Sequence, residues 1–318
     1  MINSCITAYA DEEDGDCVFY VINITTDENE AYLSENSSFL TSNNIPTTNP
    51  VVIAISSSAN GIAVVDSVDA KTIARIMDGR SCAELETVIN EAGLYAGYER
   101  AEFITMEHFM EALMRTVFDV PASTDEQDDE DFYSSLDDAK KSASQIVYHE
   151  AGHAVISEVL CPESVTLVSA HNRGGRSGGF TDYYNDKTHS PLFWTKSRIV
   201  GALGGIAAIE QKYGIFDVGG ERDLEHAFDR TKSLIVNTCI GGFHLHSNGY
   251  EDTETLKSEQ EKAVAAEVEK FYRKAKEIIA LNYEFFEKIA VALAKKKLLS
   301  AVDIKAIKSE CKIVPVAL

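Results

Sequence analysis

Apolar residues recur every three or four positions along most of the chain after residue 68, which is the spacing of one face of an α-helix. The pattern predicts helices in three consecutive segments, residues 69–77, 81–100 and 104–118. Ser81 and Glu84, three residues apart at the start of the second segment, are typical of a capping box. The apolar faces of these segments indicate a small helical bundle.

The N-terminal residues follow a different pattern, with no lysine or arginine before Lys71. Residues 18–24 and 51–56 are rich in β-branched residues and bounded by turn-forming residues, so they predict two short strands. Much of the remaining region is polar and acidic. The sequence leaves two interpretations open here, a small α/β region or a partly disordered one.

An acidic stretch separates the predicted bundle from the rest of the chain. Six acidic residues crowd into residues 125–131, and no lysine or arginine occurs between Arg115 and Lys140. Because like charges at this density resist compaction, we expect a solvated linker. The chain is thus predicted to have four parts: an acidic N-terminal region (1–68), a helical subdomain (69–120), the linker (121–140) and a C-terminal domain (141–318).

The whole chain is strongly acidic, with 29 Lys and Arg against 51 Asp and Glu and a formal net charge of −22. Such a chain is repelled by phosphate backbones and anionic lipids, so we expect no nucleic-acid partner and no direct membrane insertion. No apolar run reaches the roughly 18–20 residues that span a bilayer. The six cysteines form no C-x-x-C pair, and the start does not resemble a signal peptide. These features predict a soluble cytoplasmic protein.

The main candidate for a catalytic motif is the H-E-x-x-H sequence His149-Glu150-Ala-Gly-His153. Its apolar flanks predict a helix that ends before Pro162. Histidines four residues apart lie on one helix face, so both imidazoles can bind one zinc ion, and Glu150 can take a proton from zinc-activated water. The motif predicts a zinc peptidase; the alternative is two ordinary histidines on an amphipathic helix. Gly152, unfavourable inside a helix, indicates close approach of another backbone or of a metal-binding loop.

A catalytic zinc needs a third protein ligand, and the residues alone leave its identity open. The metzincin continuation H-x-x-G-x-x-H is absent, which excludes that family. Downstream candidates are His171, His189, Glu210, Asp223, Glu225, His226, His244 and His246. Asp223 stands where a helix over residues 223–236 is expected to begin, so its alternative role is to complement the positive helix end. His244 and His246 would share one face of a strand and offer a second, less expected metal site.

Three blocks of sequence together resemble the peptidase domain of the FtsH family of AAA zinc metalloproteases. They are YHEAGHA at residues 148–154, LGGIAA at 203–208 and GGERDLEHA at 219–227, in the family's order and at similar spacing. The match covers roughly residues 140–310, including a last helix that starts at Ser300-x-x-Asp303. This resemblance implies His149, His153 and Asp223 as zinc ligands and Glu150 as the catalytic base.

The predicted bundle is similar to the ATPase lid subdomain of the same family. The fold class implied is mainly α: a helical zinc-peptidase domain with a small β-hairpin or sheet, preceded by an AAA-lid-like bundle and a small α/β N-terminal region. The chain departs from the family in two ways. It has no G-x-x-x-x-G-K-[ST] phosphate loop, and the Gly-rich residues 174–179 are better explained as a turn between strands at 165–170 and 179–184. Ile206 stands where the family usually has arginine, which puts oligomer contacts in doubt.

The sequence therefore predicts a zinc metalloendopeptidase that cleaves extended or unfolded polypeptides, with Zn²⁺ as cofactor, Glu150 as general base and no ATPase activity of its own. The resemblance implies a homo-oligomer, a hexamer as in the family, or a hetero-oligomer with an AAA ATPase subunit. The alternative function is a non-catalytic or auxiliary subunit of complete FtsH-type proteases. A purely structural zinc site is disfavoured, since such sites usually fill all four positions with Cys and His.

Overall fold

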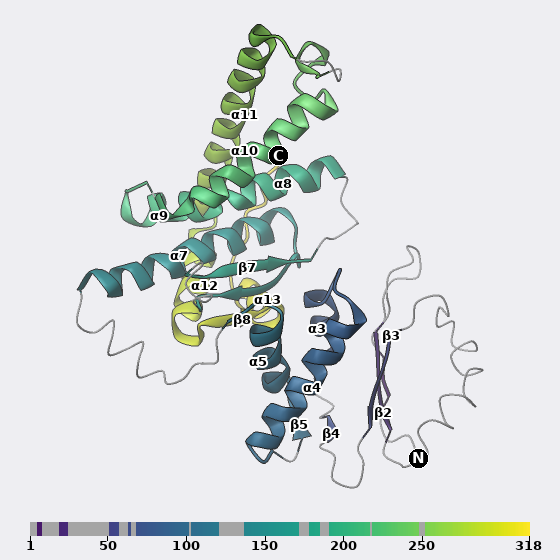
Figure 1. Cartoon of the computed structure of the whole chain (residues 1–318). Helices are drawn as coiled ribbons and strands as arrows, with labels where there is room; N and C mark the ends of the chain where they lie inside the picture. The colour runs from purple at the N-terminus through teal and green to yellow at the C-terminus, as the bar shows by residue number, and fades with distance from the viewer. Residues whose placement is uncertain are drawn as a thin grey trace. The chain divides into compact units, whose positions relative to one another are not determined.

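The computed structural model of the chain describes residues 5–7, 19–24, 51–56, 63–64, 68–101, 103–120, 137–171, 178–184, 191–216, 218–247 and 252–318. The chain divides into two compact units, Met1–Ala122 and Ser123–Leu318 (Figure 1). Helices make up most of the described part of both units, which confirms the predicted mainly α fold. None of these helices is both long and apolar enough to cross a lipid bilayer.

The first unit contains a small sheet of three described strands. Strand β2 (Phe19–Ile24) is antiparallel to β1 (Cys5–Thr7) and parallel to β3 (Val51–Ser56). The strands predicted at residues 18–24 and 51–56 are therefore confirmed. A shorter parallel pair joins β4 (Ala63–Val64) to β5 (Phe103–Ile104).

Three helices complete the described part of the first unit: α3 (Ala70–Ile76), α4 (Cys82–Tyr98) and α5 (Met106–Thr116). The predicted capping box opens α4, where the Ser81 hydroxyl accepts the Glu84 N–H and the Glu84 carboxylate accepts the Ser81 N–H. Helices α4 and α5 pack together through buried apolar side chains. The predicted helical bundle is confirmed.

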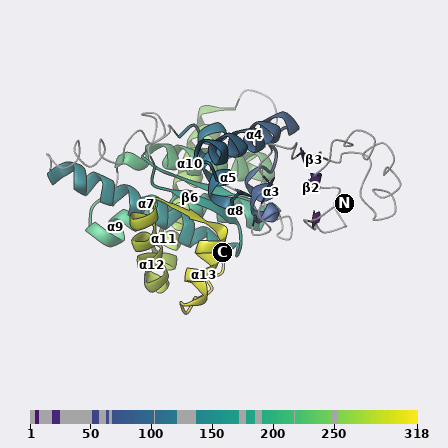
Figure 2. The same cartoon turned by 90° about the horizontal axis from the view of Figure 1, so that it is seen from below.

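Helix α7 (Asp137–Leu160) is the central element of the second unit. It ends before Pro162, as predicted, and begins inside the segment predicted as a linker, whose acidic residues 125–131 lie outside the described residues. Ala151, Ala154, Val155 and Ile156 are all fully buried, so neighbours cover this part of the helix on most sides. Figures 1 and 2 show α9 (Gly204–Tyr213) and α12 (Tyr283–Lys296) beside it.

The other helices of this unit are α8 (Pro191–Ala202), α10 (Glu221–Thr238), α11 (Glu254–Leu281) and α13 (Ala301–Ser309). Helix α10 begins two residues before the predicted start. Helix α13 begins after Ser300, as predicted, and Ser300 and Asp303 form a capping box there. One apolar core, to which α7, α11 and α12 contribute most, holds these helices together.

A three-stranded antiparallel sheet lies against α7, in the order β7 (Phe180–Tyr183), β6 (Val165–Ser169), β8 (Leu298–Ser300). The two strands predicted at residues 165–170 and 179–184 are confirmed. The sequence did not predict β8, which follows β7 only after five described α-helices. Strand β7 lies at the sheet edge, next to the histidine-bearing part of α7.

Candidate metal centre

The two histidines of the H-E-x-x-H motif lie side by side on α7. Their Nε2 atoms are 3.0 Å apart and their ring centroids 4.7 Å apart. His153 is buried and His149 is partly exposed. The helix thus brings two imidazole donors to one point, as the four-residue spacing predicts.

Asp223, in the first turn of α10, brings a carboxylate to the same point. Its Oδ2 lies 3.0 Å from His149 Nε2 and 3.3 Å from His153 Nε2. Zinc bonds of about 2.0–2.2 Å at tetrahedral angles separate two donors by about 3.3–3.5 Å, close to these distances. Among the described residues this trio is the group able to hold a metal ion.

The hydrogen-bond pattern also fits a cation. Nδ1 of His153 lies 2.8 Å from the carbonyl oxygen of Gly201, so Nδ1 carries the hydrogen. Nε2 of the neutral ring then directs a lone pair towards His149 and Asp223, as a metal ligand must. A carbonyl on the far nitrogen is also the partner that metal-bound histidines use to orient the ring.

Glycines allow helix α9 to approach α7 closely beside the two histidines. A Cβ on Gly152 would meet the carbonyl of Gly204 on α9, and a Cβ on Gly204 would meet the backbone of Gly152. The backbone approach predicted from Gly152 is therefore confirmed. On the next residue of α9, a Cβ on Gly205 would strike the His149 ring. Side chains at these positions would push α9 away from the histidines.

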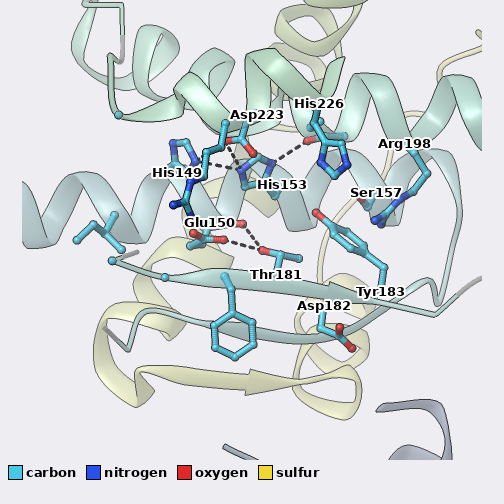
Figure 3. A pocket seen from close by; sticks show the side chains of 18 of the residues that line it. His149, Glu150, His153, Ser157, Thr181, Asp182, Tyr183, Arg198, Asp223 and His226 are labelled. Atoms are coloured by element: carbon cyan, nitrogen blue, oxygen red, sulfur yellow. Dashed lines mark hydrogen bonds and ion pairs between the residues drawn. The ribbon is translucent and has the colours of Figure 1, made fainter. Parts of the chain in front are cut away.

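Glu150 points from α7 towards strand β7. The Thr181 hydroxyl donates to Glu150 Oε2 at 2.9 Å, as the dashed line in Figure 3 shows. Burial raises the pKa of the Glu150 carboxyl, although the two imidazoles oppose this. A Cβ on Gly179 would lie 2.7 Å from Glu150 Cγ, so the bare backbone before β7 makes room for the carboxylate.

Asp223 is held as a carboxylate by its neighbours. Burial alone would raise its pKa, but the imidazoles of His153 and His149 outweigh burial and keep the pKa well below its usual range. His149, Glu150, His153 and Asp223 all line one cleft of about 840 Å³. An ionised carboxylate, two imidazoles and a buried carboxyl group therefore meet in one cleft.

Models of known protein families match the part of the chain that contains this site. Residues 136–307, more than half of the chain, match the model of peptidase family M41. The chain belongs to peptidase family M41. Residues 67–111 of the same chain match the AAA+ lid domain model.

Two similar proteins illustrate the relationship. The ATP-dependent zinc metalloprotease FtsH 2 of Sphaerobacter thermophilus is 28% identical over 269 residues, covering 81% of this chain and 39% of that protein. The ATP-dependent zinc metalloprotease FtsH of Thermotoga maritima is 28% identical over 266 residues, covering 77% and 42%. The resemblance found in the sequence is confirmed, and the chain spans about two fifths of the length of these relatives.

Within the M41 domain, the other candidates for a third ligand do not belong to the described group that could hold a metal ion. Glu210 of α9 accepts Lys276 Nζ at 2.6 Å and the Tyr272 hydroxyl, so its charge is balanced away from the histidines. Glu225 and His226 are exposed on α10, and the described group does not include His171. His189 lies outside the described residues.

The strand predicted around His244 and His246 is wrong. Phe243–Leu245 form a 3₁₀ turn, and Nδ1 of His246 lies 2.7 Å from the Val236 carbonyl oxygen. The contact ties the loop back to the end of α10, and the alternation of the two histidines did not reveal it.

Sequence reasoning also missed residues that shape the M41 site. Thr181, Gly179 and Gly205 touch Glu150 or limit the space beside His149, yet each belongs to a segment distant from the motif. The LGGIAA block carried a signal for Gly205, since a glycine pair opening a helix indicates close packing. Thr181 carried none.

Proposed function

We propose that the chain is a zinc metalloendopeptidase that cleaves extended or unfolded polypeptides. The observation that carries the proposal is the convergence of His149, His153 and Asp223 beside a buried Glu150 in the cleft of an M41 domain. Two imidazoles and a carboxylate suit Zn²⁺ and leave a fourth position open, as catalytic zinc sites do.

His149, His153 and Asp223 would hold the zinc ion. When bound, zinc supplies Lewis acidity, which lowers the pKa of water at the site towards about 7 and polarises the scissile carbonyl. The Gly201 carbonyl keeps the proton of His153 on Nδ1, so that Nε2 stays free to bind the metal. The α9 glycines keep both rings in place.

Glu150 acts as the general base. Its carboxylate takes the proton of the attacking water and returns it to the leaving amine, because burial has brought its pKa closer to that of the groups it serves. The Thr181 hydroxyl holds Oε2 and so orients the carboxylate towards the cleft. Loss of the carboxylate removes the proton acceptor while leaving the three ligands intact.

The edge strand β7 would bind substrate backbone. An extended polypeptide can add to an exposed sheet edge through main-chain hydrogen bonds, and β7 runs along the cleft beside Glu150. Backbone pairing needs an unfolded segment and reads little sequence. Unfolded proteins are therefore the expected substrate class.

The polypeptide substrate would be unfolded by other subunits, or it would already be unfolded when it binds. The 318 residues contain no phosphate loop, so we infer that they do not hydrolyse ATP. A homo-oligomer such as a hexamer, or a hetero-oligomer with an AAA ATPase subunit, is the assembly that the family and the lid-like segment favour. Mass measurement with and without such an ATPase distinguishes the two.

The test is cleavage of casein, an unfolded protein, by the purified chain without ATP. We expect cleavage with one equivalent of zinc, none after chelation, and recovery when zinc is restored. Stoichiometric zinc without cleavage would contradict the proposal and favour an auxiliary subunit. Unchanged cleavage in chelator would contradict the metal's role.

A further inference from the structure

Three arginines line the cleft: Arg222 is the sequence neighbour of Asp223, and the other two are more distant from the metal group in sequence. Arg198 comes from α8 and Arg230 from α10, helices that pack together, and both side chains border the same cleft as His149 and Glu150. Both arginines are partly buried. In a chain with a net charge of −22, a pair of cations at the end of a cleft indicates a specific role.

Tyr183 of the edge strand holds the first arginine. The guanidinium carbon of Arg198 lies 3.9 Å from the centroid of the Tyr183 ring, a cation–π contact. Burial raises the pKa of the Tyr183 hydroxyl, so the ring stays neutral. Figure 3 shows Arg198, Tyr183 and Ser157 grouped together on the far side of His153 from Glu150.

Neither arginine has a carboxylate within ion-pair distance in the part of the chain that the structure describes. The acidic residues of the cleft are engaged or exposed: Asp223 with the histidines, Glu150 with Thr181, Asp182 with the Thr166 hydroxyl at 2.5 Å, and Glu221 in solvent. Burial and the charge of Arg198 instead lower the pKa of Arg230. The two cations repel each other, and an anion between them would remove the repulsion.

We propose that Arg198 and Arg230 form a subsite for a carboxylate of the polypeptide substrate, either an Asp or Glu side chain or the substrate's C-terminal carboxylate. The proposal rests on the peptidase function proposed above. Guanidinium groups bind carboxylates through two parallel hydrogen bonds, which gives both strength and orientation. The subsite would add a sequence preference to otherwise general backbone recognition.

The fold also predicts where this carboxylate stands in the substrate. Ser157 lies one turn beyond His153 on α7, about 6 Å along the helix axis. Tyr183 lies two residues beyond Thr181 on the same face of β7, about 6.6 Å away, and an extended substrate advances about 3.3 Å per residue. The favoured carboxylate is therefore about two residues from the scissile bond, on one side only.

Peptide binding to the Glu150→Gln chain loaded with zinc tests the subsite without turnover. The peptides share one neutral parent sequence, in which Glu, Gln or Lys replaces each position in turn. Fluorescence anisotropy gives the Kd of each peptide. We expect Glu to bind about tenfold more tightly than Gln at one or two adjacent positions, the ratio typical of hydrogen bonds to a charged group. Lys should bind more weakly than Gln there.

Variants assign the preference to the two arginines. Arg198→Met and Arg230→Met, made in the same background, should bring the Glu to Gln ratio close to one. Lys232→Met is the matched control on α10, because Lys232 is exposed and does not line the cleft, and it should keep the preference. Peptides ending in a free acid or an amide distinguish a C-terminal carboxylate from a side chain.

Equal affinities for Glu, Gln and Lys at every position and at the C-terminus would overturn the subsite, as would a preference that survives both Met variants. If those variants fail to fold, the peptide series measured on the Glu150→Gln chain alone tests the subsite. If the Glu preference is present but the unmodified chain cleaves none of the peptides or casein, the peptidase function fails and the subsite stands.

Discussion

Helix α7 buries two glutamates, eight residues apart, in opposite surroundings. Glu158, 3% exposed, accepts Lys308 Nζ at 2.9 Å and the backbone N–H groups of Val165 and Glu163 at 3.0 and 3.1 Å. Glu150, 7% exposed, has no lysine or arginine partner among the described residues and accepts the Thr181 hydroxyl. One carboxylate is compensated, whereas the other lies beside a group of atoms that could hold a metal ion.

The difference is the one that the proposed function requires between a structural glutamate and a general base. A buried carboxylate with a cation and two N–H donors stabilises the fold, and Glu158 joins α7 to α13 in this way. A buried carboxylate without them costs stability and acquires a raised pKa, which is characteristic of functional sites. Both residues are buried glutamates, so their partners are what distinguish them.

The largest expected effect comes from neutralising each glutamate in turn. Glu150→Gln should lower kcat/KM by about 10²–10⁴, the usual contribution of a general base, with no loss of stability. Glu158→Gln should keep the rate per folded molecule within about twofold, because its partners lie outside the cleft. Peptide cleavage rates normalised to folded protein measure both. An equal loss of rate in the two variants would contradict the distinction between Glu150 and Glu158.

A second pair of carboxylates sharpens the same comparison. Asp223→Ala should weaken zinc binding by more than the roughly 10–100-fold that loss of an outer partner costs. Glu210→Ala should leave zinc affinity unchanged, since Glu210 pairs with Lys276 on α11. Competition with a chromogenic chelator gives both affinities. Zinc binding that depends on Glu210 would make it the third ligand.

The structural role of Glu158 predicts a smaller effect at its partner. Lys308→Met should lower the free energy of unfolding by about 2–3 kcal/mol, because it leaves a buried carboxylate without its cation. Lys305→Met is the control on the same helix, and its exposed pair with Glu163 should cost less than about 1 kcal/mol. Urea titration measures both. Similar costs would mean that burial adds nothing to the Glu158 pair.

The smallest effect is expected at the start of α13, which carries Lys308. Ser300→Ala removes the hydroxyl that accepts the Asp303 N–H and should cost about 1 kcal/mol. Ser309→Ala, at the exposed end of the helix, should stay within about 0.5 kcal/mol. Thermal unfolding of the two variants compares them. If Ser300→Ala leaves stability unchanged, the cap does not stabilise α13.

Much of the fold was predictable because its signals are local. The helix over the H-E-x-x-H motif, the capping boxes at Ser81 and Ser300, and strands β2, β3, β6 and β7 all follow from short stretches of sequence. The convergence of His149 and His153 is equally local, since one helical turn separates them. Their positions needed no knowledge of the rest of the chain.

The remaining features depend on contacts between distant segments. Asp223 is 70 residues beyond His153, and only the resemblance to a family distinguished it from Glu210. The contrast between Glu150 and Glu158 depends on Thr181 and Lys308, which the sequence does not connect to α7. Strand β8 and the pairing of Arg198 with Tyr183 arise from tertiary packing in the same way.

The most direct test of the account is to locate the zinc ion by anomalous diffraction at the zinc edge, using crystals of the Glu150→Gln chain grown with one equivalent of zinc. We expect one principal peak, bound by His149 Nε2, His153 Nε2 and a carboxylate oxygen of Asp223. A principal peak held by other residues, or no peak among these three, would contradict it.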